Sequence, residues 1–237
     1  MLELGIKLLA SYLLGSLNGS LIIGKFTGVD IRSVGSRNAG GTNALRTQGA
    51  WFAAGVMVID VGKGFLPAWL FPTLVLPGVP LDPEISRTWL MLGCGCASIV
   101  GHCYPVWFDF AGGKGAATLI GMLIAVAPGS LLPGLIVFAG MLVLTGWVGL
   151  ATMTAVSALP VVLWITAGPD RLPTVIALAA VALFIIYTHR SNISRIARGA
   201  EDRIDKVMLF RRRSRDDQST PNQSTPNKST HNKSSDD

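Results

Sequence analysis

The feature that most constrains this chain is the scarcity of charge over its first 188 residues. That part carries only 16 of the 34 Lys, Arg, Asp and Glu residues, so the remaining 18 are concentrated after it. Charged residues make up 14% of the whole chain, against about 25% in a soluble domain. Because a soluble fold could not cover its surface with so few charges, the sequence predicts an integral membrane protein. The net charge of +6 gives little support to nucleic-acid binding, and we expect no nucleic-acid partner.

Apolar stretches of roughly the ~20 residues that a helix needs to cross a bilayer divide this part of the chain. They lie at about 2–24, 50–77, 88–107, 116–168 and 172–188. The fourth stretch is too long for one helix. Breaks at Pro128-Gly129 and around Gly146 and Gly149 predict three short helices in it, near 116–128, 131–146 and 150–167.

The distribution of basic residues orients these helices through the positive-inside rule. Segment 25–49 carries four basic residues and one acid, and the region after residue 188 begins with arginines. If both lie in the cytoplasm, an even number of spans separates them, which requires an odd number in stretch 116–168. The prediction is an all-α bundle of seven transmembrane helices, with the N-terminus outside and the C-terminus in the cytoplasm.

The two ends of the chain differ in character. Glu3 and Lys7 stand inside the first apolar run, and neither a basic segment before it nor a small-x-small cleavage signal indicates a cleaved signal peptide. After about residue 214, variants of Gln-Ser-Thr-Pro-Asn repeat with a period of five and no apolar residue is available to pack. We therefore expect a polytopic membrane domain over 1–213 and a disordered cytoplasmic tail over 214–237. The arginine cluster at 211–215 either contacts anionic lipid headgroups or acts only as an orientation signal.

Few residues could hold a metal or form a disulfide framework. The three cysteines, Cys94, Cys96 and Cys103, fall in one apolar stretch, where small buried core residues are expected. We predict no metal site and no cofactor. Asp60 and Lys63 stand three apart on one helix face, and because each would be costly alone in a membrane, we interpret them as a structural ion pair rather than a catalytic one.

The first motif that could carry chemistry runs from Gly35 to Arg46. Its glycines, asparagines and hydroxyl residues can place several N–H and O–H donors around one point, and Arg46 can add a bidentate charge. This composition suits a phosphate or carboxylate, although a loop so rich in glycine can also be a tight connection.

A second motif runs from Gly101-His102 to Gly112-Gly113-Lys114-Gly115. Glycines let backbone amides approach an oxyanion closely, Lys114 offers a mobile charge, and the helix expected to follow favours an anion at its start. The spacing is not that of a Walker A loop. The alternative is a flexible turn with a lysine that reaches toward the membrane surface.

The third motif, His189-Arg190-Ser191-Asn192, follows the last apolar stretch. Alone, a His-Arg pair at this place is typical of an interfacial anchor. The predicted topology, however, brings all three motifs to the cytoplasmic side. A shared anion-binding site is therefore the favoured interpretation.

Taken together, these motifs resemble, in order and spacing, the acyl-phosphate:glycerol-3-phosphate acyltransferase family of bacterial membranes. The resemblance covers about residues 10–200, and Asp60-x-x-Lys63-Gly64 looks similar too. It implies a seven-helix enzyme of the bacterial inner (plasma) membrane with its active site on the cytoplasmic side. Such an enzyme moves a fatty acyl group from acyl phosphate to the 1-hydroxyl of sn-glycerol 3-phosphate. The products are lysophosphatidic acid and phosphate, in the first acylation of phospholipid synthesis.

The resemblance also implies roles for individual residues. The positions that match catalytic ones are Ser36, Arg46, His189 and Asn192. Those expected to bind substrate are Asn38, Gly40, Thr42, Asn43, His102, Gly112, Gly113, Lys114 and Gly115. Two positions depart from the family pattern: Arg37 stands where glycine is usual, and Ser191 replaces the glutamate of His-Arg-Glu-Asn.

Acyl phosphate is an activated anhydride, so a protein that transfers its acyl group needs to align the reactants, stabilise an oxyanion and remove one proton. His102, His189 and a substrate phosphate are the candidate bases, and a covalent acyl-Ser36 intermediate is disfavoured. The main alternative function is a membrane transporter or binder of a small phosphorylated solute, which should place its polar groups near the midplane or show an inverted repeat. A metal-dependent transferase would need clustered acids, which the sequence lacks.

Overall fold

The computed structural model describes residues 1–204 and residue 208 of the chain. These residues form α-helices, short 3-10 helices and loops, with no strand among them, so the all-helical class is confirmed. The α-helices are α1 (Leu2–Gly15), α2 (Gly19–Thr27), α3 (Gly41–Gln48), α4 (Ala50–Leu70), α5 (Arg87–Cys103), α6 (Ala116–Val126), α7 (Leu131–Thr145), α8 (Val148–Ala167), α9 (Leu172–Thr188) and α10 (Arg190–Ala197). The predicted tail at 214–237 and the arginine cluster at 211–215 lie outside the described residues.

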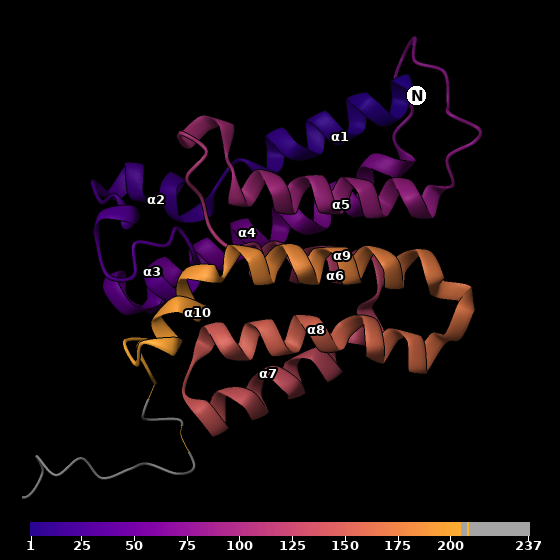
Figure 1. The fold of residues 1–237 in the computed structure, drawn as a ribbon. Helices are drawn as coiled ribbons and strands as arrows, with labels where there is room; N and C mark the ends of the chain where they lie inside the picture. Colours follow the sequence, from indigo (N-terminus) through magenta and orange to yellow (C-terminus); the bar gives the residue numbers. More distant parts are fainter. Residues whose placement is uncertain (205–207, 209–237) are drawn as a thin grey trace, which may run out of the picture.

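Several helices are long and apolar enough to cross a membrane. Within the described residues four continuous helical runs meet this criterion, and the pair α1 and α2, bent by 42° at a short break, makes a fifth if counted as one. One run, Val148–Thr188, holds both α8 and α9, which pack side by side (Figure 1). The apolar helix α6 has only 11 residues. The fold is that of a membrane protein, while the count of seven spans stays a prediction.

The long apolar stretch 116–168 is divided into three helices, α6, α7 and α8. A 3-10 turn at Pro128–Ser130 separates the first two. Gly146 then ends α7 in the left-handed region, at φ +72°, which glycine adopts at little cost. The breaks lie where proline and glycine predicted them.

The helices form two groups that pack together along their length (Figure 1). In the first, α1 packs on α5, and α4 packs on both α5 and α6; in the second, α8 packs between α7 and α9. Glycines allow the closest approaches. A Cβ atom at Gly64 of α4 would lie 2.0 Å from the Thr118 carbonyl oxygen of α6, and one at Gly15 of α1 would lie 2.3 Å from that of Ser98 in α5. Small residues at helix contacts are typical of membrane bundles.

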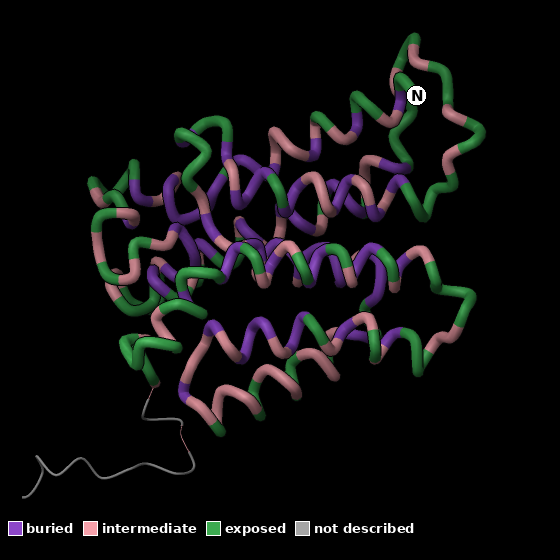
Figure 2. The backbone as a smooth tube through the Cα atoms, in the orientation of Figure 1, coloured by how far each residue is buried: buried purple, intermediate pink, exposed green. Residues whose placement is uncertain are grey.

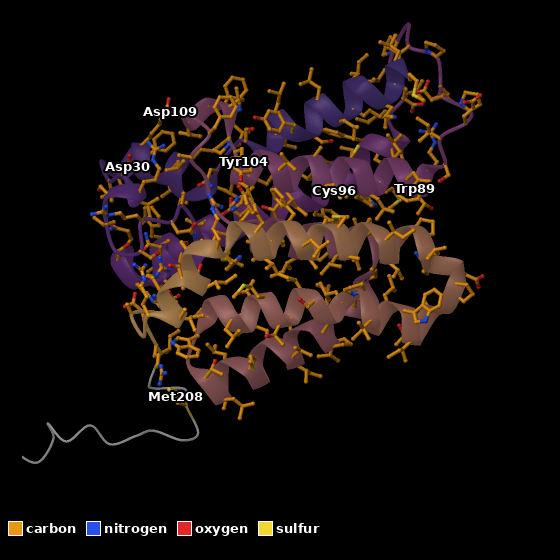
Figure 3. The ribbon with its side chains drawn as sticks, viewed as in Figure 1. Asp30, Trp89, Cys96, Tyr104, Asp109 and Met208 are labelled. Atoms are coloured by element: carbon orange, nitrogen blue, oxygen red, sulfur yellow. The ribbon has the colours of Figure 1, made fainter. Side chains whose placement is uncertain are left out.

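Burial follows this arrangement. Figure 2 shows buried residues along the faces where helices meet, whereas α7 contains no buried residue, only half-buried and exposed ones. Cys96 lies partway along α5 within the bundle (Figure 3), and all three cysteines are free. The exposed side chains of α7 are almost all apolar, as expected for a helix in contact with lipid.

The two ends of the bundle are unlike each other. The three loops that carry the predicted motifs lie at one end, with α2, α3 and α10, and the loop 74–86 lies at the other end, beside the N-terminus (Figure 1). At that second end the side chains of Glu3 and Lys7 pair at 2.7 Å, both almost fully buried, and Arg87 also donates to Glu3 at 2.7 Å. This pairing explains how two charges are tolerated in the first apolar run.

Candidate active site

A pocket of about 230 Å³ opens at the end of the bundle where the three motif loops meet. Among the described residues, eleven of the thirteen predicted site residues line it. They are Ser36, Asn38, Gly40, Thr42, Asn43, Arg46, His102, Lys114, Gly115, His189 and Asn192. The convergence of the three motifs, which are far apart in sequence, is therefore present in the structure.

Gly112 and Gly113 do not line this pocket. Gly112 N donates to the Cys103 carbonyl at 3.2 Å, and Gly113 N donates to that of His102 at 3.1 Å. A Cβ atom at Gly113 would lie 2.1 Å from Nε2 of His102. The two glycines thus pack the loop tightly around His102, which itself faces the pocket.

The first turns of three helices line the pocket, namely those of α3 at Gly41–Asn43, α6 at Ala116–Ala117 and α8 at Val148–Gly149. The first backbone N–H groups of a helix have no partner within it, and the helix dipole makes this end favourable for anions. The first backbone bonds are donated by Ala44 in α3 and by Leu119 in α6, which leaves the preceding amides of each helix available. Three helix starts around one cavity make a strong site for a phosphate or an oxyanion.

Asn43 organises the loop before α3. Its Nδ2 donates to the carbonyl oxygens of Ile31 at 3.1 Å and Val34 at 3.0 Å, and its Oδ1 accepts from the Ser36 amide at 2.9 Å. Because these bonds occupy the buried Asn43 side chain, it supports the loop that presents Ser36. The Ser36 side chain lines the pocket and is half-buried.

Arg37 has a backbone feature that accounts for the glycine usual at this position. Its φ is +60°, in the left-handed region that costs an L-residue roughly 1–2 kcal/mol. The side chain is exposed and does not line the pocket. The departure therefore bears on backbone strain, and no added charge enters the cavity.

Two of the cations predicted from the sequence reach the pocket, from different elements. Arg46 of α3 pairs with Asp202 at 3.2 Å. Lys114, in the loop before α6, donates to Oδ1 of Asn192, and its carbonyl accepts from Thr188 at 3.0 Å. Burial lowers the pKa of Lys114 to about 8, and the nearby cations Arg195 and Arg190 lower it too, whereas Glu201 raises it. Lys114 is consequently charged at neutral pH but loses its proton within the pH range of ordinary activity assays.

His189 follows α9 and is buried. Its Nδ1 lies 2.8 Å from the Ile185 carbonyl oxygen, and because a carbonyl can only accept, Nδ1 carries the proton of the neutral ring. The lone pair is then on Nε2. Burial lowers the pKa of His189 to about 4, so the ring is neutral and able to accept a proton at neutral pH.

The predicted pair of Asp60 and Lys63 forms, with a separation of 2.9 Å between Oδ1 and Nζ. A third group joins it that the sequence did not indicate: His102 Nδ1 lies 3.5 Å from the same Oδ1, which also accepts from the Gly19 amide at 3.0 Å. Lys63 donates to the Leu17 carbonyl at 3.1 Å. The bonds to Gly19 and Leu17 tie α4 to the α1–α2 break, and Asp60 and His102 also line the pocket. That the pair is structural rather than catalytic stays a prediction.

Sequence reasoning missed several groups in the site. Glu201 and Arg195 line the pocket, and both bond within it. A second, apolar cavity of about 280 Å³ adjoins the first among α6, α7 and α8. The two cavities share the five residues Met57, Ala116, Ile120, Phe138 and Thr152. Apolar side chains in a membrane helix carry no signal of a cavity in the sequence, because lipid-facing and cavity-facing positions have the same composition.

Comparisons with known proteins agree on one family. The family model described as glycerol-3-phosphate acyltransferase matches residues 5–199. Among curated proteins, the chain is similar to the glycerol-3-phosphate acyltransferase of Aquifex aeolicus, with 36% identity over 81% of this chain and 95% of that protein. The protein of the same name from Salinibacter ruber is 37% identical over 86% of this chain and 93% of its own.

Two solved structures are similar to this one. They are crystal structures of PlsY, described as an integral membrane glycerol 3-phosphate acyltransferase, in a glycerol 3-phosphate form and a lysophosphatidic acid form. The first has a TM-score of 0.73 and 33% identity, and covers 85% of this chain and 95% of that one. The second has a TM-score of 0.71 at the same identity, with coverages of 84% and 94%.

Proposed function

The chain belongs to the glycerol-3-phosphate acyltransferase family, and we propose that its acyl donor is an acyl phosphate and its acceptor the 1-hydroxyl of sn-glycerol 3-phosphate. The acceptor oxygen forms an ester bond with the acyl carbon, and the bond between that carbon and the phosphate oxygen breaks. The phosphate leaves with the electron pair, and the hydroxyl proton passes to a base. The products are lysophosphatidic acid and inorganic phosphate.

The observation that carries this proposal is the junction of a polar cavity with an apolar one. Both substrates bear a phosphate, and the polar cavity offers three helix starts, Arg46 and Lys114 to bind them. Only the donor and the product bear a long acyl chain, and the apolar cavity beside α7 suits that chain. The shared residues at the junction, among them Met57 and Thr152, mark where the reacting carbonyl would lie.

The proposed catalytic groups follow from this placement. Ser36 and the amides at the start of α3 stabilise the tetrahedral oxyanion, and such donors are typically worth ~2.7–4 kcal/mol in the barrier. His189 Nε2 accepts the hydroxyl proton, since its neutral tautomer leaves that atom free, and a bound phosphate raises the pKa of the ring by its negative charge. Asn192, held beside Lys114, completes the polar wall.

We further propose seven membrane spans with the pocket on the cytoplasmic side of the bacterial inner membrane. The supporting observation is that the basic loop before α3 and the arginines of α10 lie at the same end of the bundle (Figure 1). In oriented inner-membrane vesicles, a membrane-impermeant thiol reagent should label Arg37→Cys and Glu84→Cys from opposite sides. Labelling from the same side would contradict this topology.

The function is tested by phosphate release from palmitoyl phosphate by the purified protein, with and without glycerol 3-phosphate and with metals and CoA omitted. We expect release that depends on the acceptor and is lost in Ser36→Ala. The matched control is Ser33→Ala, an exposed serine in the same loop that does not line the pocket. Transfer from palmitoyl-CoA but not from palmitoyl phosphate would contradict the proposed donor.

A further inference from the structure

Arg195 of α10 lacks the acidic partner that the helix could have supplied. Residues four apart on a helix lie on one face, so an acid at position 191 could pair with Arg195. This chain has Ser191 there, exposed and uncharged. Arg195 is paired instead with Glu201, whose Oε2 lies 2.6 Å from its Nε, and Glu201 is only 6% exposed. The acid therefore comes from beyond the helix.

The backbone after α10 explains how Glu201 returns to the site. Gly199 takes φ +68°, the left-handed conformation that commonly ends a helix, and the Ala200 amide donates to the Arg195 carbonyl at 2.8 Å. Farther along, the Ile204 amide donates to the Gly146 carbonyl at 3.0 Å, and Arg203 stacks over Trp147 at 4.4 Å. Segment 199–204 thus lies across the ends of α8 and α10, with Glu201 turned into the pocket.

Glu201 also fixes the amide of Asn192. Its Oε1 accepts from Asn192 Nδ2 at 2.6 Å, and Asn192 Oδ1 accepts from Lys114. Because a carboxylate can only accept and an ammonium can only donate, these two partners determine which end of the amide faces which way. Without the carboxylate, the Asn192 amide could turn over and present its NH₂ group to Lys114, which would repel it.

We infer that Glu201 is a positioning residue for the acyl transfer: through Asn192 it holds Lys114 in the phosphate site. This inference rests on the proposed function. It also assigns a role to a residue that lies just beyond the family match at 5–199.

The charges around Lys114 make this role measurable. The charged or titratable side chains that line the pocket with it are Arg46, Asp60, His102, His189, Arg195 and Glu201, and Arg190 of α10 is also close enough to act on it. Among the described groups with a resolved effect on Lys114, Glu201 is the acid that favours its charged form. Removing that carboxylate should let Lys114 lose its proton at lower pH.

The test uses the full chain and measures kcat/KM for glycerol 3-phosphate from pH 6 to 10, with palmitoyl phosphate as donor. For Glu201→Gln we expect a loss of about tenfold or more at pH 7, since hydrogen bonds to charged groups are strong, and an alkaline limb displaced to lower pH. Glu201→Asp, which keeps the charge, should keep the wild-type limb. The control is Asp170→Asn, an exposed acid at the opposite end of the bundle, which should match the wild type.

A second variant separates positioning from a purely structural role. Ser191→Glu/Glu201→Ala supplies Arg195 with an acid on its own helix face but leaves Asn192 without its acceptor. We expect it to restore the melting temperature but not kcat/KM at pH 7. Full recovery of kcat/KM in this double variant, or a wild-type rate and limb in Glu201→Gln, would overturn the inference.

The variants also cover the two ways in which the test could be obscured. If Glu201→Gln does not fold, Glu201→Asp and the double variant decide by the same criteria. If the folded wild type releases no phosphate in the presence of glycerol 3-phosphate, the proposed function is wrong. If the wild type is active and Glu201→Gln is equally active, only the inference about Glu201 is wrong.

Discussion

Two clusters of charged and polar groups lie at opposite ends of the bundle, and they differ in what remains unpaired. At the far end, Lys7 bonds to Glu3 at 2.7 Å and to the Leu74 carbonyl at 2.8 Å, while Glu3 accepts from Lys7, Arg87 and the Asp82 amide. The buried groups there are fully occupied by the protein itself. A closed network of this kind stabilises the fold and offers nothing to a ligand.

At the pocket end, Arg46 and Lys114 are only loosely occupied by the protein itself. Arg46 pairs with Asp202, a carboxylate that is 72% exposed, and such exposed pairs are worth little. Lys114 bonds to a neutral amide, and the first turns of three helices line an open cavity. The comparison teaches that burial of charge alone does not mark a site here. Unsatisfied donors beside a cavity do.

The largest expected effect tests the closed network. Lys7→Met removes one of the three donors to the Glu3 carboxylate and leaves Arg87 and the Asp82 amide, and loss of a partner from a buried ion pair is destabilising. We expect a much lower melting temperature in detergent, with kcat of the folded fraction unchanged. A stable Lys7→Met protein with altered kcat would break the contrast between the two ends.

The next largest expected effect tests the loosely occupied cations at the pocket end. Lys114→Ala removes a charged donor from the phosphate site, which should lower kcat/KM for glycerol 3-phosphate by roughly 10²–10³-fold while the melting temperature changes little. The measurement is acceptor-dependent phosphate release beside a thermal melt. A large drop in melting temperature without a drop in kcat/KM would place Lys114 with the structural groups.

The pH profile sharpens the same contrast. Since kcat/KM reports the free enzyme and burial lowers the pKa of Lys114 to about 8, Lys114 is charged below that pH and neutral above it. The kcat/KM of the wild type should therefore fall by about tenfold per pH unit above pH 8. Lys114→Arg, which keeps its charge at all these pH values, should lack that limb, and an identical limb in this variant would exclude Lys114 as its source.

The smallest effect concerns backbone strain beside the site. Arg37→Gly relieves a residue held at φ +60° and should stabilise the protein by about 1 kcal/mol. Because the Arg37 side chain does not line the pocket, kcat/KM should stay within about twofold. A thermal melt and one activity assay check both statements, and a large gain in activity would show that the arginine does affect the site.

The sequence predicts the local features of this fold well. Proline and glycine mark the divisions of stretch 116–168, and the charge pattern brings the three motif loops to one end. These features depend on neighbouring residues and on the membrane, whose constraint on helices is strong. The Asp60 and Lys63 pair is predictable for the same reason, because both residues lie on one turn of one helix.

The features that the sequence does not predict depend on contacts between distant elements. Glu201 reaches Asn192 only because Gly199 reverses the chain, and His102 joins Asp60 from another helix. The apolar cavity arises from how α6, α7 and α8 diverge, which their uniform composition does not encode. Gly112 and Gly113 show the converse: a glycine pair typical of anion binding packs closely around His102 and does not line the pocket.

The most direct test of the central claim is equilibrium binding of glycerol 3-phosphate without any acyl donor, measured by titration calorimetry at pH 7. The account predicts binding to the wild type, unchanged Kd in the folded Lys7→Met protein, and a Kd raised about tenfold or more in Lys114→Ala. Equal affinity of Lys114→Ala and the wild type would contradict the claim that the unsatisfied groups at the pocket end bind the phosphate.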